Sequence, residues 1–179
     1  MCGADAVILA FPQRSLTKFV SGETVSYKWD DSDSSVDTTK RLSIKQLPRH
    51  LLIHLKRFDF DYTTMTQRKL NDRFEFPREL DMQPFTLEGR PDPARSGSKT
   101  DESSPAVSHD SNYYKYELAG IVIHSGSAQA GHYYSYIRSR DREGHPWFEF
   151  NDAYVSPFDD NTIPDRAFGG SWGGQTQVR

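Results

Sequence analysis

The stretch YYKYELAGIVIHSGSAQAGHYYSYIRSRDREGHPWFEFNDAYVSPF, residues 113–158, decides the fold of this chain. Four segments within it are rich in aromatic and β-branched residues, and Gly, Asp or Pro stands between one segment and the next. Aromatic and β-branched residues favour strands, whereas Gly, Asp and Pro favour the turns that join them. The pattern therefore predicts an antiparallel meander, in which each strand pairs with the one that follows it.

The first part of the chain predicts a helix and a hairpin. Residues 14–20 have the composition of a short helix, with Ser15 as a possible N-cap. Polar and apolar residues alternate at residues 23–29, which predicts a strand. The acidic, serine-rich residues 30–37 that follow predict a hairpin tip or a loop.

Two further segments before the meander predict strands. LLIHLKRFDF, residues 51–60, has apolar residues that are too dense for a surface strand. We expect a central strand there, buried on both faces near its start. RKLNDRFEFP, residues 68–77, predicts a strand pair that Pro77 closes.

Composition divides the chain into one domain, an insertion within it and two frayed termini. Residues 88–111 are rich in Pro, Gly, Ser and charged residues and almost lack large apolar ones. Such a segment cannot bury enough apolar surface to offset the entropy of ordering, so we expect a disordered insertion. Residues 1–14 and 171–179 are expected to fray. The domain itself is then expected to span residues 15–170.

Charge and the lack of a long apolar run argue against nucleic acid and membranes as partners. The 22 Lys and Arg residues and 25 Asp and Glu residues give the chain a formal charge of −3, and no basic stripe is visible. We therefore expect no nucleic-acid partner. No apolar run is long enough to cross a bilayer, so we expect no membrane partner. Cys2 is the single cysteine, which excludes an internal disulfide and fits the cytoplasm or the nucleus.

His132 and Asn151 are the first candidates for catalysis. His132 stands where a loop of small residues becomes a strand, so rigid structure can position it while the ring stays open to a ligand. Asn151 ends a later strand of the same predicted sheet, and an adjacent strand can bring it beside His132. An imidazole oriented by an amide or carboxylate is the base half of a nucleophilic triad, and papain-like enzymes have the chain order Cys, His, Asn.

Less specific interpretations of the same residues stay open. A lone histidine at the edge of a strand is often only a hydrogen-bonded polar residue, and Asn followed by Asp is a common turn. His124 and His132 together suggest a metal site, but no cysteine pair or carboxylate stands at ligand spacing. Of Tyr133, Tyr134 and Tyr136, two are expected to serve only in sheet packing.

Several motifs, in order, resemble the C-terminal half of the catalytic domain of the ubiquitin-specific proteases. These motifs are LPRHLLIHLKRFDFD (47–61), KLNDRFEFP (69–77), YELAGIVIHSGSAQAGHYYSYIR (116–138) and WFEFNDAYVSPFD (147–159). FGG at residues 168–170 is similar to the Fat-facets-type branch of that family. The family consists of deubiquitinating cysteine proteases of papain-like ancestry.

The resemblance assigns a role to each candidate residue. It implies that His132 is the general base, that Asn151 orients the imidazole, and that Asp152 assists by holding the histidine or polarising the oxyanion region. The loop from Gly126 to Gly131 resembles the one that closes over the C-terminal tail of ubiquitin. Gly126, Gly131 and Tyr133 are therefore the expected tail-binding residues. The small residues of this loop suit a tail that ends in two glycines.

The nucleophile is the main departure from the family pattern. The family places its cysteine in a Gly-Asn-Cys box at the start of a helix, and this sequence contains no such box. His132 and Asn151 follow Cys2 by 130 and 149 residues, close to the papain spacing of about 130–150. We interpret that spacing as coincidence, because the papain pattern would place the nucleophile at Asp5. We expect no nucleophile in this chain.

A second departure concerns metal. Family members often carry CxxC pairs that bind zinc in the fingers, and Trp29 and Ser32 stand where those cysteines would be. Neither side chain replaces a thiolate ligand. We therefore expect no metal at the tip of the fingers and no cofactor elsewhere.

The predicted fold is α+β and mostly antiparallel β, with the palm and part of the fingers of a papain-like catalytic domain and without its helical thumb. The LKRF motif, residues 55–58, is expected to be part of the palm structure. The implied function is that of the C-terminal part of a thiol-dependent ubiquitinyl hydrolase, inactive as this chain alone. Its expected partners are ubiquitin and ubiquitinated proteins. A catalytically dead ubiquitin-binding or scaffold module is the alternative.

Overall fold

The computed structural model describes residues 12–30, 34–89 and 109–170 of the chain. These residues form two compact units, each built from segments that are distant in sequence. Among the described residues, the first unit comprises 52–78 and 117–170, and the second comprises 12–51 and 79–116.

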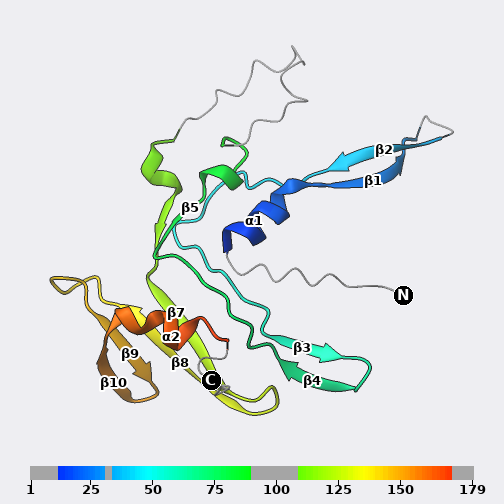
Figure 1. The fold of residues 1–179 in the computed structure, drawn as a ribbon. Coiled ribbons are helices and arrows are strands. Elements are labelled where there is room, and N and C mark those ends of the chain that lie inside the picture. The colour runs from blue at the N-terminus through cyan, green and yellow to red at the C-terminus, as the bar shows by residue number, and fades with distance from the viewer. Residues whose placement is uncertain (1–11, 31–33, 90–108, 171–179) are drawn as a thin grey trace. The chain divides into compact units, whose positions relative to one another are not determined.

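The first unit is built on a four-stranded sheet. Its strands are β7 (Gly120–Gly126), β8 (Gly131–Arg138), β9 (Trp147–Asn151) and β10 (Tyr154–Phe158). The order across the sheet is β10-β9-β8-β7, and each neighbouring pair is antiparallel (Figure 1). The predicted meander is therefore confirmed.

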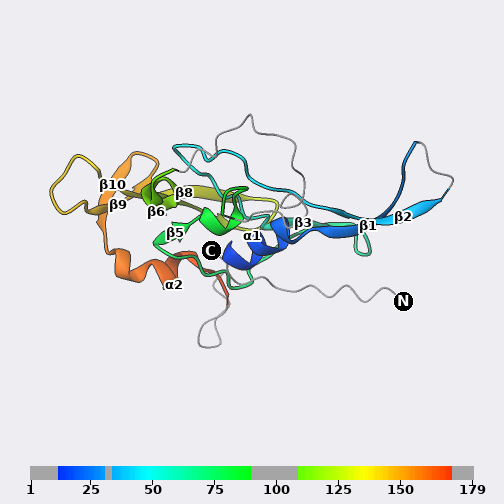
Figure 2. The ribbon, with the colours of Figure 1, turned by 90° about the horizontal axis from the view of Figure 1, so that it is seen from above.

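One face of this sheet carries the core of the first unit. Side chains alternate between the two faces of a strand, and Ile123, Tyr136 and Trp147 all lie on the same face. The short helix α2 (Ile163–Ala167) and Phe168 pack against them. Figure 2 shows α2 on one side of the sheet.

The hairpin of β3 (Phe58–Asp61) and β4 (Thr66–Lys69) completes the first unit and corrects two predictions. The buried central strand predicted at residues 51–60 is wrong: residues 51–57 are not in a strand, and Leu52 is 94% exposed. The strand pair predicted up to Pro77 is also wrong, because no strand continues from Leu70 to Pro77. Dense apolar residues and closely spaced strand-like residues do not by themselves supply a neighbouring strand to pair with.

The second unit combines a helix, a hairpin and a small sheet. Its elements are α1 (Pro12–Ser21), β1 (Glu23–Lys28), β2 (Ser35–Lys40), β5 (Glu79–Asp81), η1 (Gln83–Phe85), η3 (Ser111–Tyr114) and β6 (Lys115–Glu117). β1 pairs antiparallel with β2, and β5 pairs with β6. Its buried core residues are Val20, Leu47, Leu80, Met82, Phe85 and Tyr114.

Two predicted boundaries in the second unit need correction. The helix α1 begins at Pro12, so Ser15 lies inside it and is not the N-cap, and residues 12–14 are helical where fraying was expected. A proline suits this first position because its missing N–H has no partner in the first turn of a helix. Residues 1–11 and 171–179, also expected to fray, lie outside the described residues.

The predicted insertion at residues 88–111 is described only at its two ends. Ser111 already belongs to η3, so the predicted insertion extends slightly too far. The Glu88 carboxylate accepts a hydrogen bond from the Tyr114 hydroxyl and contacts Nδ1 of His109 at 3.3 Å. The prediction for residues 90–108 falls on residues that the structure does not describe.

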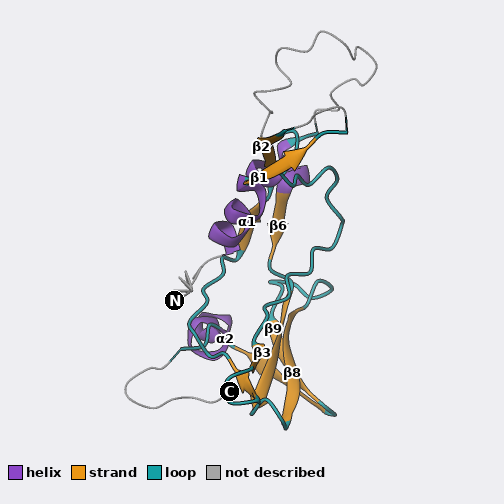
Figure 3. Cartoon of the chain, turned by 90° about the vertical axis from the view of Figure 1, so that its right-hand side faces the viewer, coloured by secondary structure: helices purple, strands orange, loops and turns teal. Residues whose placement is uncertain are grey.

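Strands predominate and helices are few in the described chain (Figure 3). The predicted α+β class with mostly antiparallel strands is thus confirmed. Among the described residues, no helix is both long enough and apolar enough to span a bilayer.

Candidate active site

His132 lies at the start of β8, on the face of the sheet that carries the core. Two positions further along the same face is Tyr134, and two beyond that is Tyr136, which is 1% exposed and stacks on Phe158 at 3.8 Å between ring centroids. The His132 side chain is 45% exposed. The covered face therefore ends at His132, so the packed part of β8 anchors a ring that solvent can reach.

Asn151 is the residue that contacts this ring. It is the last residue of β9, the neighbour of β8 in the sheet, and its Oδ1 lies 2.7 Å from Nε2 of His132. An amide oxygen only accepts hydrogen bonds, so Nε2–H is the donor and the proton of the neutral imidazole resides there. Nδ1 then carries the free lone pair and is the basic nitrogen.

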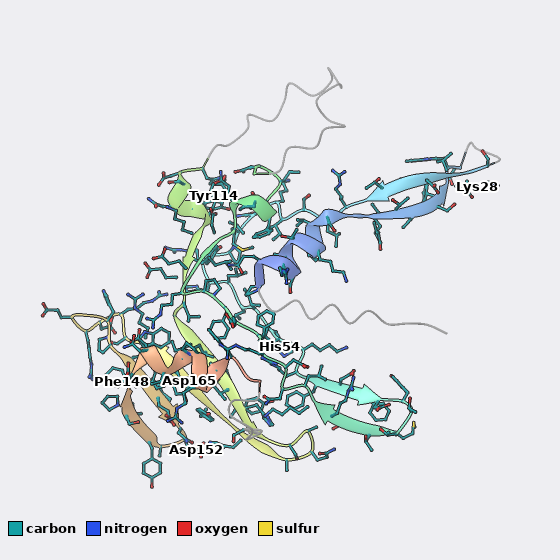
Figure 4. The ribbon with its side chains drawn as sticks, in the orientation of Figure 1. Lys28, His54, Tyr114, Phe148, Asp152 and Asp165 are labelled. Carbon is teal, nitrogen blue, oxygen red and sulfur yellow. The ribbon has the colours of Figure 1, made fainter. Side chains whose placement is uncertain are left out.

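Asp152 is close to the imidazole but is not its hydrogen-bond partner. Its Oδ2 lies 3.9 Å from Nε2 of His132, beyond hydrogen-bond distance, and its side chain is 78% exposed. It is the first residue of the turn between β9 and β10, where Figure 4 labels it, and its φ is +52°. Its charge can attract a protonated imidazole, while the amide of Asn151 provides the orientation.

Gly126 and Gly131 face each other at the base of the loop that precedes His132. Gly126 has φ +107°, a conformation that only glycine adopts without strain. A Cβ at Gly131 would overlap Nε2 of His124 and the carbonyl oxygen of Ser125. The chain therefore turns closely around the His124 ring, and both glycines are needed for that path.

Tyr133 lies on the other face of the sheet from His132, because consecutive strand residues alternate. Its exposed ring packs edge-on against His124 at 4.7 Å. The structure therefore brings together His132 and Asn151 with Asp152 nearby, and separates Tyr133 from them by the thickness of the sheet.

His124 does not share a metal site with His132, because the two rings project from opposite faces. Burial lowers the pKa of His124, and the charge of Lys69 lowers it further. Its buried Nδ1 has no hydrogen-bond partner within the described part of the chain. The same described residues contain no cluster of three or more His, Cys, Asp or Glu side chains able to hold a metal ion. Cys2 and Ser32 lie outside them.

Lys69 was missed by the sequence analysis. It ends β4, and its ammonium donates to the carbonyl oxygens of His124 at 2.7 Å and Gly126 at 3.1 Å. Its partners are backbone atoms more than 50 residues away in the sequence. No local pattern of side chains therefore distinguishes this lysine from any other on a surface strand.

Comparison with known proteins identifies the family. Residues 8–169 match the family described as ubiquitin carboxyl-terminal hydrolase. The chain is 41% identical over 178 residues to ubiquitin carboxyl-terminal hydrolase 9Y of Mus musculus, and 39% identical over 171 residues to the probable ubiquitin carboxyl-terminal hydrolase FAF of Drosophila melanogaster. Each match covers 90% of this chain but only 7% and 6% of the respective relative.

Solved structures show the same relationship. The SAGA Ubp8/Sgf11/Sus1/Sgf73 DUB module bound to ubiquitin aldehyde contains a chain that matches with a TM-score of 0.61 and 30% sequence identity, over 85% of this chain and 30% of that one. A second match, to a SAGA DUB module bound to monoubiquitin, has a TM-score of 0.61 at 29% identity and covers 85% of this chain and 29% of that one. This chain belongs to the ubiquitin carboxyl-terminal hydrolase family.

Proposed function

We propose that this chain supplies the base and its orienting amide to a thiol-dependent hydrolase that cleaves the bond after the C-terminal glycine of ubiquitin. The observation that supports this most strongly is the 2.7 Å contact between His132 Nε2 and Asn151 Oδ1 at the open end of a packed sheet. Membership of the hydrolase family supplies the reaction class.

Each residue has a distinct role in this proposal. Nδ1 of His132 removes the proton from a cysteine thiol and later returns it to the leaving lysine amine. Asn151 fixes the tautomer in which Nδ1 is free. Asp152, at 3.9 Å, stabilises the imidazolium by charge alone.

The loop from Gly126 to Gly131 is proposed to receive the tail of ubiquitin. It leads directly into His132, and its tight turn is held by a hydrogen bond from the Ser127 N–H to the Ala130 carbonyl at 2.8 Å. A tail that ends in two glycines can approach such a backbone closely. Tyr133, on the other face of the sheet, is proposed to flank the path of the tail before it reaches the loop.

The wider assignment is also proposed. Residues 15–170 would form the palm and part of the fingers, the partners would be ubiquitin and ubiquitinated proteins rather than nucleic acid or membranes, and the compartment would be the cytoplasm or the nucleus. This sequence has no Gly-Asn-Cys box and one cysteine, Cys2. We therefore expect that the 179-residue chain alone does not cleave a ubiquitin C-terminal amide reporter. A non-catalytic ubiquitin-binding module is the second candidate.

A chimaera separates the two candidates. Residues 8–169 replace the matching segment of the mouse 9Y relative, and the unaltered relative serves as the host control. The hydrolase proposal predicts that the chimaera cleaves the reporter and that His132→Ala lowers the rate by at least about 10³-fold. Asn151→Ala should cost less, because it orients the base without transferring a proton.

His145→Ala is the matched control, since its ring is exposed in the loop between β8 and β9 and its Nδ1 lies 3.3 Å from the Ser139 carbonyl oxygen. We expect this variant to keep the chimaera's rate. A chimaera that binds ubiquitin without cleaving it, while the host control is active, would favour the binding module. A His132→Ala chimaera with an unchanged rate would remove His132 from the mechanism.

A further inference from the structure

Lys69 binds the end of β7, where the loop from Gly126 to Gly131 begins. Its Nζ lies 2.7 Å from the carbonyl oxygen of His124 and 3.1 Å from that of Gly126. These two residues are separated by one position in β7, so their carbonyls point to the same side of the strand. One ammonium therefore binds two successive outward-facing acceptors.

Those acceptors lie where the sheet has no further strand. β7 is at the edge of the sheet, and within the described part of the chain β8 is its only strand neighbour. Outward-facing carbonyls of an edge strand lack ladder partners. At this end of β7, the side chain of Lys69 takes the place that a neighbouring strand would fill.

A second contact ties the tip of the loop to the same strand. Nε2 of Gln129 donates to the carbonyl oxygen of Gln67 in β4 at 3.1 Å. The loop is thus bound to β4 at its start, through Lys69, and near its tip, through Gln129. From the same hairpin, the ring of Phe58 packs edge-on against His124 at 4.9 Å.

The environment of Lys69 is unusual for a surface lysine. Burial lowers the pKa of its ammonium, and the nearby charge of Arg57 lowers it further. A lysine that only needs solvation extends into water, because removing the charge from water costs free energy unless its N–H groups find acceptors. The two carbonyls supply acceptors, and hydrogen bonds from a charged donor are stronger than neutral ones.

We propose that Lys69 is a positioning residue of the site, which holds the Gly126–Gly131 loop against β4 in the shape that receives a diglycine tail. The loop ends at His132, so the same contacts also fix the approach to the base. The inference rests on the proposed function for the identity of the ligand. We call the contacts of Lys69 and Gln129 that join the loop to β4 the clamp, and these contacts form in the chain without ligand.

The test uses the 179-residue chain and two methionine variants on one strand. Lys69→Met keeps most of the side-chain volume and removes the donors. Arg68→Met is the matched control, because it removes the adjacent cation, whose partner is Asp59 across the hairpin at 3.0 Å and not the loop. Amide exchange is measured at Ser127 and Ala130, and NMR titration compares intact ubiquitin with ubiquitin that lacks its last two glycines.

We expect Lys69→Met to speed exchange at both loop amides by about tenfold or more, as loss of charge-assisted hydrogen bonds implies. It should also reduce the preference for intact over truncated ubiquitin by a similar factor. Arg68→Met should leave both measurements unchanged. Unchanged loop exchange in Lys69→Met would overturn the clamp, whatever the chain binds.

Chemical rescue distinguishes the ammonium from simple packing. In a Cys2→Ser background, Lys69→Cys is alkylated in two ways. Bromoethylamine restores an ammonium on a side chain of nearly the same length as lysine, whereas iodoethane gives an uncharged side chain. We expect the first product to restore slow exchange and tail preference, and the second to restore neither. Equal rescue by both would contradict the proposal. If the unaltered chain bound intact and truncated ubiquitin equally well, the diglycine tail would not be the ligand of the loop, and the proposed function would fail. The exchange result at Ser127 and Ala130 would still stand.

Discussion

The two faces of the four-stranded sheet differ sharply, although the same strands build both. On the covered face Tyr136 is 1% exposed and packs beside Trp147 under α2. On the other face, Val122 is 72% exposed, and Phe150 and Val155 lie exposed in the same cross-strand row. The covered face provides stability, whereas the open face is available for contacts.

The candidate site lies at the boundary of this division. His132 and Asn151 belong to the covered face, but they stand beyond the residues that α2 and Phe168 pack against. Packing therefore fixes the strands that carry the two side chains, while both side chains remain within reach of a ligand. A catalytic pair needs both conditions, because rigid strands hold its geometry and exposure admits the substrate.

The largest expected effect comes from emptying the covered face. Tyr136→Ala should lower the free energy of unfolding by about 3–5 kcal/mol, because it leaves a cavity where a fully buried ring was packed. Val122→Ala on the open face should cost about 0.5 kcal/mol or less. Native-state hydrogen exchange of the β8 amides measures both. Equal costs for the two variants would show that the faces do not differ in stability as their burial implies.

A pH series sharpens the same comparison. Burial raises the pKa of Tyr136, so the folded state retains the phenol proton after the unfolded state has lost it. The stabilisation is complete below the unfolded pKa of about 10 and declines by up to about 1.4 kcal/mol per pH unit above it. Tyr136→Phe should remove this part of the decline, measured as the difference from the unaltered chain between about pH 9 and 11.

The matched control for that series is Tyr133→Phe, on the open face. The buried Tyr136 phenol is unchanged in this variant, so the variant should show the alkaline decline of the unaltered chain. If Tyr136→Phe and Tyr133→Phe changed the alkaline decline equally, the protected environment assigned to Tyr136 would be wrong.

A smaller effect is expected at the turn where the covered face ends. Asp152 has φ +52°, which a β-branched residue adopts only with strain. Asp152→Val should lower the free energy of unfolding by about 1–2 kcal/mol, whereas Asp152→Asn, which tolerates this conformation, should change it by less than about 0.5 kcal/mol. Urea unfolding of both variants decides the point. An Asp152→Val chain as stable as the unaltered one would show that the positive φ at residue 152 imposes no such cost.

Much of the meander and of the site could be predicted, because their signals are local. Alternation and turn residues define β7 to β10, and strand adjacency was enough to expect Asn151 beside His132. Alternation also shows that Tyr133 and Tyr136 lie on different faces. It likewise places Tyr133 and His132 on opposite faces. It does not show which face α2 covers, so the burial of Tyr136 had to come from the structure.

The failures have a common cause, which is that they depend on distant backbone. Residues 51–57 have the apolar density of a buried strand, but no strand pairs with them in the described chain, and Leu52 is exposed. Lys69 looks like a solvated charge, yet it binds carbonyls of His124 and Gly126. Sequence patterns report what a segment prefers locally, not which backbone atoms the fold brings within reach of it.

The hydrogen bond from Nε2 of His132 to Oδ1 of Asn151 is the feature on which the proposed chemistry depends most directly. Long-range ¹⁵N–¹H NMR of the histidine-labelled 179-residue chain, with the imidazole neutral, reports which ring nitrogen carries the proton. We expect the proton on Nε2 and a free Nδ1 in the unaltered chain, and a mixture of both tautomers in Asn151→Ala. A proton on Nδ1, or a tautomer ratio that Asn151→Ala leaves unchanged, would contradict the assignment of His132 as a base that Asn151 orients.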